Sequence, residues 1–200
     1  MNATKEYILK TSLILFLQKS YRDVTMKEIV EKTGLSKGAF YHYFNSKEEL
    51  FKEIAYMFFS MGNVDYSIFN QNSLSEFYQQ YAEYLDKSFI SLSELSKDSS
   101  EGNSSFNFFL ILFEAISRFP EFLDMELEMH IKDVEAWKVV IANARKNDEI
   151  KTASSDEEIA SLFLYCNDGA FIRYLNNNSA SSFKKVLLQA YDTIYQNLKI

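Results

Sequence analysis

An all-α fold is predicted by three features of this 200-residue sequence. Chain breakers are scarce, with one Pro and five Gly, whereas strands joined by tight turns would need more of both. Long stretches place apolar residues three and four positions apart, the spacing of a helix with one buried face. Hydrophobic residues make up 47% of the chain, which is enough to fill a core. We therefore expect a helical N-terminal domain over residues 1–60 and a helical C-terminal domain over residues 61–200.

Charge divides the chain unevenly between these two parts. Residues 1–60 carry nine basic and seven acidic residues, a net charge of +2. Since the whole chain has a net charge of −7, residues 61–200 have a net charge of −9. A basic head on an acidic body is typical of a protein that turns one end toward nucleic acid. With Cys166 as its single cysteine, the chain is predicted to form no internal disulfide. Its apolar runs are too short to span a bilayer, and its start lacks the pattern of a signal peptide. We therefore expect a cytoplasmic protein.

The first two helices are predicted from apolar spacing and capping residues. A first helix should end near Ser20, with an apolar stripe formed by Ile8, Leu9, Leu13, Phe16 and Leu17. Thr25 and Glu28 then have the spacing of a capping box, which starts a second helix. Gly34 suits the left-handed residue that ends this helix, and Ser36 can cap the next one.

Together these signals predict a helix-turn-helix from Thr25 to Phe44, or about residues 24–43. In the third helix, expected over Lys37–Tyr43, Phe40 and Phe44 should pack inward, which leaves Lys37, Gly38, Tyr41 and His42 facing outward. A lysine can donate to guanine, tyrosine and histidine can donate to phosphate oxygens, and a glycine lets the backbone approach the groove.

A fourth helix is predicted to begin at Lys47, because Ser46 and Glu49 form a second capping box. The amides of its first turn, together with the Lys47 ammonium, would form an anion site suited to a phosphate. Apolar residues along one face of this helix allow it to join the head to the body.

The segment VTMKEIVEKTGLSKGAFYHYFNSKEELF resembles, nearly position for position, the helix-turn-helix signature of the tetracycline-repressor (TetR) family. The resemblance covers about residues 3–60, and the remainder matches the family only in being helical and of the expected length. It implies base contacts from Lys27, Lys37 and Gly38, and phosphate contacts from Thr25, Tyr41, His42, Tyr43 and Lys47. Ala39 departs from the pattern, since many relatives have a hydroxyl residue there. Tyr43 could instead belong to the core.

The body is predicted to contain further amphipathic helices. The expected sequence is a helix marked by Leu74, Phe77, Tyr81, Leu85, Phe89 and Leu92, a loop at 96–105, a buried helix over Phe106–Arg118, a helix opened by Pro120 and running to about Asn147, and two final helices over about 156–174 and 180–198. The stripe of the helix after Pro120 should be Leu123, Leu127, His130, Val134, Trp137 and Ile141. For the helix over 156–174 it should be Ile159, Leu162, Phe163, Cys166 and Ala170.

The TetR resemblance implies that the last two helices pair with their copies in a homodimer, whose two heads would read a palindrome about 34–36 Å apart. It also implies an effector pocket in the body. Aromatic residues that could line it for a small apolar or cationic molecule are Tyr78, Tyr81, Phe109, Phe113, His130, Trp137 and Tyr165. For each of these, packing in the core is the more common role.

The expected function is therefore sequence-specific DNA binding by a transcriptional repressor that a small-molecule effector releases from a palindromic operator. A helical adaptor that binds protein, and an enzyme that relies on carboxylates, are the alternatives. With two His and one Cys, the sequence has no HExxH motif, no Glu-x-x-His motif and no P-loop. We expect no catalytic site, metal or cofactor.

Overall fold

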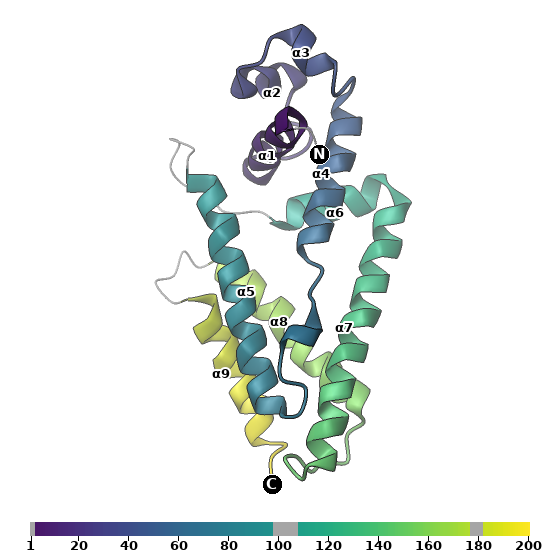
Figure 1. The fold of residues 1–200 in the computed structure, drawn as a ribbon, viewed down its shortest axis with the longest axis vertical. Coiled ribbons are helices and arrows are strands. Elements are labelled where there is room, and N and C mark those ends of the chain that lie inside the picture. Colours follow the sequence, from purple (N-terminus) through teal and green to yellow (C-terminus); the bar gives the residue numbers. More distant parts are fainter. Residues whose placement is uncertain (1–2, 98–107, 177–181) are drawn as a thin grey trace. The chain divides into compact units, whose positions relative to one another are not determined.

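A computed structural model of the protein describes residues 3–97, 108–176 and 182–200 (Figure 1). These residues form α-helices and one 3₁₀ turn, with no strand among them, which confirms the all-α prediction. The elements are α1 (Ala3–Gln18), α2 (Met26–Thr33), α3 (Lys37–Tyr41), α4 (Lys47–Met61), η1 (Tyr66–Ile68), α5 (Leu74–Lys97), α6 (Phe108–Arg118), α7 (Pro120–Lys146), α8 (Asp156–Asn176) and α9 (Phe183–Gln196).

Some predictions fall outside the described residues. These are the loop predicted at 96–105 from residue 98 onward, the start of a helix at Phe106, the start of the last helix at Ala180, and the side chains of Phe89, Leu92 and Phe109.

The chain divides into two compact units. The first contains residues up to Val64 together with Leu95–Glu126, and the second contains Asp65–Glu94 together with Leu127–Ile200. By contacts, the first unit therefore extends past the domain boundary predicted at residue 60 and includes α6. The periodicity of a helix shows which of its faces is buried but not which helix covers that face. The sequence therefore contains no signal that α6 packs with the first unit.

The core of the first unit lies between α1, α2, α4 and α6, which pack against one another. The stripe predicted for α1 is buried, and Ser12 on the same helix is satisfied because its hydroxyl donates to the Ile8 carbonyl at 2.7 Å. The side chains that complete this core from the following helices are Phe40, Phe44, Leu50, Phe51 and Ile54. The head is thus a packed support for the helix-turn-helix.

The core of the second unit is a cluster of aromatic rings. Trp137 of α7 lies at its centre, with its ring centroid 4.9 Å from Phe77, 4.8 Å from Phe163 and 5.7 Å from Tyr191. Because these rings come from α5, α7, α8 and α9, the cluster ties together the helices of this unit.

Three residues of the predicted apolar stripes are exposed in the single chain. Leu123 and Leu127 of α7 are 45% and 50% exposed, and Leu162 of α8 is 48% exposed. In the first turns of α7, Phe122 is buried instead, so the buried face there is rotated relative to the stripe. The Val134, Trp137 and Ile141 portion of the α7 stripe is buried as predicted.

Glu149 anchors the start of α5. Its carboxylate accepts from the amides of Leu74 and Ser75 at 2.9 Å and from the Ser73 and Tyr195 hydroxyls at 3.1 Å. A carboxylate there also interacts favourably with the helix dipole. Burial acts to raise the pKa of Glu149, but these hydrogen bonds outweigh it and the pKa lies below its usual value.

We predict that Glu149→Gln lowers the free energy of unfolding by about 1–2 kcal/mol at pH 7. Because the folded-state pKa is lowered, this contribution is complete above the unfolded pKa of about 4.3 and is lost as the pH falls through the folded value. Urea melts of both proteins at pH 7 and pH 3.5 measure the difference, which should shrink at the lower pH. Asp148→Asn removes a neighbouring exposed charge at a position with φ of 54°, which Asn tolerates, and should change little. A difference that persists unchanged at pH 3.5 would contradict this account.

Candidate nucleic-acid interface

The turn of the helix-turn-helix is set by local hydrogen bonds. Thr25 caps α2, since its Oγ1 accepts from the Glu28 amide at 3.2 Å. Gly34 ends the helix with φ of +65°, a left-handed conformation that costs glycine little, and its amide donates to the Glu31 carbonyl. Ser36 caps α3 by accepting from the Ala39 amide at 3.2 Å. The three caps lie where the sequence predicts them.

Helix α3 ends at Tyr41, before the predicted end at Tyr43. The Tyr43 amide donates to the Phe40 carbonyl at 2.9 Å, a bond three residues back that tightens the chain into a turn. Phe44 enters the core behind this turn and is fully buried, while Tyr43 is half-buried, with its ring centroid 5.2 Å from that of His42.

The outer side of α3 presents the residues expected to meet DNA. Lys37, Gly38 and Ala39 are exposed, as is His42 at the C-cap, and Tyr41 is half-buried. The Lys37 Nζ lies 5.9 Å from the centre of the Tyr41 ring, so the cation is held above an aromatic face. A Cβ added to Gly38 would meet nothing within 4 Å, which means that its open surface does not serve packing within the protein.

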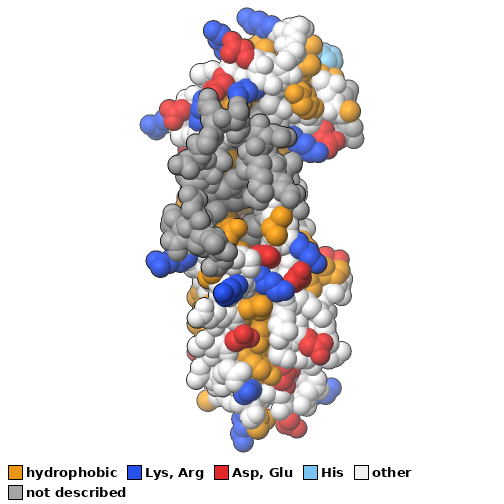
Figure 2. Space-filling view, turned by 90° about the vertical axis from the view of Figure 1, so that its left-hand side faces the viewer, with side chains coloured by type: hydrophobic (Ala, Val, Ile, Leu, Met, Phe, Trp, Pro, Cys, Tyr) orange, Lys and Arg blue, Asp and Glu red, His pale blue; other side chains and the backbone are white. Residues whose placement is uncertain are grey.

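Thr25 and Lys27 of the preceding turn and helix are also exposed. The Lys27 side chain is 86% exposed and lies 3.9 Å from Glu31, a surface pair worth little in water. Its ammonium is therefore available to another anion. On the face shown in Figure 2, Lys and Arg side chains lie interspersed with Asp and Glu. A DNA site on this chain would accordingly depend on a few placed cations.

Lys47 faces inward, where the sequence predicted an outward ammonium. Its Nζ donates to the Tyr21 and Val24 carbonyls at 2.7 Å each and lies 4.3 Å from the centre of the Tyr21 ring. Burial, with the charge of Arg118 adding to it, lowers the pKa of Lys47. Two carbonyls at the end of the turn before α2 attract the cation, and this long-range contact has no local sequence signal. Only the amides at the start of α4 remain from the predicted anion site.

Tyr21 is a residue that the sequence reasoning missed. The Arg118 guanidinium of α6 lies 3.9 Å from the centre of its ring, and the Phe51 ring of α4 packs edge-on at 4.8 Å. Lys52, the next residue of α4 after Phe51, forms a 2.5 Å salt bridge with Glu121 of α7. These contacts fix the start of the helix-turn-helix against α4 and α6.

We predict that Lys47→Met lowers the free energy of unfolding by about 2 kcal/mol, because two part-buried carbonyls lose a charged donor. Lys27→Met, on an exposed helix surface, should stay within about 0.5 kcal/mol of wild type. Urea denaturation measures both. Equal stability of the two variants would show that the Tyr21 and Val24 contacts of Lys47 contribute nothing to folding.

The residues predicted to line an effector pocket do not share one environment: some are buried and others are exposed. Tyr78, Tyr81 and Trp137 are buried in the second unit, where the Tyr81 and Trp137 ring centroids are 5.5 Å apart. His130 is half-buried and stacks with Tyr165, which is 61% exposed. Phe113 is 63% exposed in the first unit.

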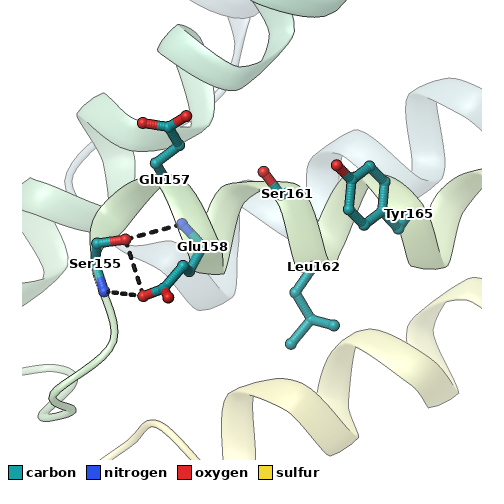
Figure 3. Close-up of a pocket in the computed structure, with 6 residues that line it drawn as sticks. All are labelled: Ser155, Glu157, Glu158, Ser161, Leu162 and Tyr165. Carbon is teal, nitrogen blue, oxygen red and sulfur yellow. Dashed lines mark hydrogen bonds between the residues drawn. The ribbon is translucent and has the colours of Figure 1, made fainter.

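Tyr165 lies instead at an open surface pocket along α8. Figure 3 shows its ring at one end and the Ser155–Glu158 cap at the other, where the Ser155 amide donates to the Glu158 carboxylate at 2.7 Å. Leu162 lies between them and points away from the helix. The pocket is thus a hollow in an exposed, partly apolar helix face.

Two further searches cover only the described residues. Within 3–97, 108–176 and 182–200, no three His, Cys, Asp or Glu side chains are grouped so that they could hold a metal ion. Across the same ranges, every helix is too short or too polar to span a bilayer.

The fold and this surface define a helix-turn-helix protein with an all-helical body. Residues 8–54 match the profile of the bacterial regulatory proteins of the tetR family. The head of the chain therefore has the helix-turn-helix of TetR-family regulators, as its sequence predicts.

The relatives are of two kinds: some match the helix-turn-helix head in sequence, and others match nearly the whole chain in fold. YerO of Bacillus subtilis (strain 168), an uncharacterized helix-turn-helix type transcriptional regulator, is 52% identical over 50 residues, which are 25% of this chain and 17% of YerO. Two solved structures share the fold over nearly the whole chain. A TetR-family regulator from Agrobacterium tumefaciens has a TM-score of 0.69 at 12% identity, covering 99% of this chain and 98% of its own. Reduced NemR of Escherichia coli has a TM-score of 0.64 at 18% identity, covering 94% of this chain and 96% of its own.

Proposed function

We propose that this protein is a transcriptional regulator that binds a palindromic operator as a homodimer, and that a small-molecule effector releases it. The exposed face of α3 is the observation that carries the proposal. Lys37 and Gly38 lie outward on α3 and His42 lies outward at its C-cap, and the Ser36 cap and the buried Phe40 hold the helix in place. Rigid presentation of a few polar groups on a short helix suits the major groove.

Contacts from the neighbouring elements extend this surface. Lys27 on α2 supplies a second exposed cation. At the start of α4, the Ser46 Oγ accepts from the Glu49 amide at 3.1 Å, and the other amides of the first turn suit a phosphate. Thr25, Tyr41 and Tyr43 can donate to phosphates from the edges of the site. In this proposal Lys47 acts by holding the turn before α2, through Tyr21 and Val24.

The proposed dimer uses the last two helices, α8 and α9, which pack against each other. On α8, Leu162, Tyr165 and Ile172 are 48%, 61% and 44% exposed and share one helix face. Gly169 lies on the same face, and a Cβ added to it would meet nothing within 4 Å. Apolar side chains around a residue without a side chain suit the close approach of a second helix.

Enrichment of bound duplexes from a random-sequence pool tests the proposal, followed by binding measurements on the enriched duplex at several salt concentrations. We expect an inverted repeat, with affinity that falls steeply as salt rises because Lys and Arg displace counterions from phosphates. Lys37→Ala should relax the sequence preference at one position of each half-site, at a cost of about 1–3 kcal/mol. If no duplex is retained at low salt, the chain does not bind DNA through this head.

A further inference from the structure

The turn between α1 and α2 is fixed by its own hydrogen bonds and by the first residue of α4. The Ser20 carbonyl accepts from the Asp23 amide at 3.1 Å and from the Val24 amide at 3.3 Å, and the Ser20 hydroxyl donates to the Asp23 carboxylate at 2.6 Å. The Lys47 ammonium donates to the carbonyls of Tyr21 and Val24. The backbone of the turn is therefore tied down on both sides of its tip.

The ring of Tyr21 fixes the same turn by packing. It stacks on the Phe16 ring of α1 with centroids 5.9 Å apart, and the Phe51 ring of α4 meets it edge-on at 4.8 Å. The Arg118 guanidinium of α6 lies 3.9 Å from its centre. All three helices belong to the first unit. The turn can change its shape only by breaking these contacts, so the side chain at its tip has a fixed point of attachment.

Arg22 is the side chain that this turn leaves outward. It is exposed, and it has no hydrogen bond, ion pair or ring contact with any residue of 3–97, 108–176 or 182–200. It is also the only arginine of residues 1–60. Within residues 3–60, by contrast, five lysines pair with glutamates at 3.9 Å or less, namely Lys5, Lys10, Lys19, Lys27 and Lys52. The Arg22 charge is therefore available to an anion from outside the chain.

The turn lies beside the surface that is proposed to contact DNA. Arg22 comes three residues before Thr25, the exposed cap of α2, and Lys47 connects the turn to the start of α4. A guanidinium can donate two parallel hydrogen bonds to a phosphate, which a lysine ammonium cannot do. Attachment to a fixed turn lowers the entropy lost when such a contact forms.

We propose that Arg22 binds a phosphate of the DNA backbone beside the helix-turn-helix, and that Tyr21 and Lys47 are positioning residues for it. The ligand is a phosphodiester of duplex DNA, which Arg22 would contact whatever the base sequence. This assignment rests on the proposed DNA-binding function. It also gives the inward Lys47 a role, because its ammonium fixes the turn that carries a phosphate contact and does not make that contact itself.

Arg22→Gln removes the charge and keeps a side chain that can be exposed at no cost to the fold. It should weaken binding to the enriched duplex about tenfold, lower the salt slope by about 1 for each head, and leave the base preference unchanged. Arg22→Lys should keep the salt slope and lose only part of the affinity. Urea melts of both variants should match wild type, since Arg22 has no partner within the described chain.

Lys10→Gln is the matched control, because it removes the same charge from the exposed side of α1, where Lys10 pairs with Glu6 at 2.9 Å. Its affinity for the duplex should stay within about twofold of wild type. Equal losses in Lys10→Gln and Arg22→Gln would overturn the proposal, because they would mean that the net charge of the head, and not a contact from Arg22, attracts DNA.

A series of duplexes in which one phosphate at a time is replaced by an uncharged methylphosphonate locates the contact. At the phosphate that Arg22 binds, the replacement should weaken wild type and have little further effect on Arg22→Gln. At every other phosphate it should act equally on the two proteins. A series without any such phosphate would overturn the proposal even if Arg22→Gln binds weakly.

The same duplexes separate a positioning role of Lys47 from a phosphate contact of its own. Lys47→Met should lose sensitivity at the phosphate assigned to Arg22, and combining it with Arg22→Gln should add little to the loss of DNA affinity. A further loss of about 1 in the salt slope, at a second phosphate, would show that Lys47 binds DNA itself and would overturn its positioning role.

The two proposals fail in different ways. If wild type binds the enriched duplex and Arg22→Gln matches it in affinity and salt slope, the Arg22 contact is wrong and the proposed function stands. If wild type retains no duplex at low salt, the proposed DNA-binding function fails, and the assignment of Arg22 fails with it.

Discussion

Gly38→Ala is expected to stabilise the free protein and to weaken its binding to DNA at least tenfold. Alanine is favoured over glycine inside a helix by about 1 kcal/mol, and the new Cβ would meet nothing within 4 Å in the protein. If α3 lies in the major groove, the same methyl group would occupy space that the DNA needs. The two effects therefore have opposite signs.

This opposition makes the substitution its own control. Thermal melts should show an unfolding midpoint at or above that of wild type, so lost binding could not be attributed to a damaged fold. Titration of the enriched duplex in the same buffer gives the affinity. A variant that is more stable and binds DNA as tightly as wild type would show that the open surface at Gly38 is not where DNA approaches.

Leu162→Glu is expected to separate the dimer and to reduce affinity for the palindrome at least a hundredfold. Leu162 is 48% exposed in the single chain, so a charge there should be tolerated by the protomer. In the proposed interface it would be buried without a partner, next to Glu158 on the same face. Linking two heads raises affinity about 10²–10⁴-fold over one, and a monomer loses that gain.

Val139→Glu is the matched control, since Val139 is 50% exposed and points to the side of α7 opposite Trp137. Sedimentation velocity should show wild type and Val139→Glu as dimers and Leu162→Glu as a monomer. Binding to a single half-site should be the same for all three proteins. If Leu162→Glu remains a dimer, the exposed face of α8 is not the interface.

Local signals explain why the helix-turn-helix could be predicted closely. The caps at Thr25, Gly34, Ser36 and Ser46 each depend on residues within about four positions, so the sequence itself contains both partners. The fold class follows for the same reason, because a helix makes its hydrogen bonds within its own segment.

Features that depend on distant partners could not be predicted. The direction of Lys47 is set by Tyr21 and Val24, and the surroundings of Tyr21 are completed by Arg118 of α6. Apolar spacing shows that a helix has a face to cover, but it does not distinguish a core from a second chain, so the spacing alone does not show what Leu162 packs against.

The same limit applies to the aromatic core of the second unit. Tyr81 and Trp137 could be singled out as aromatic residues on amphipathic helices, and both belong to the cluster. Tyr66 lies in a short 3₁₀ turn without helical periodicity. Only the folded chain places the Tyr66 ring against the Phe77 and Tyr81 rings.

A hydroxyl-radical footprint on the enriched duplex tests the central claim most directly. Two copies of α3 should protect two stretches on one side of the DNA, related by a dyad and separated by about 10 base pairs or a multiple of that spacing. A single asymmetric protected stretch, or a footprint that Gly38→Ala leaves unchanged, would contradict recognition of a palindrome by the exposed face of α3.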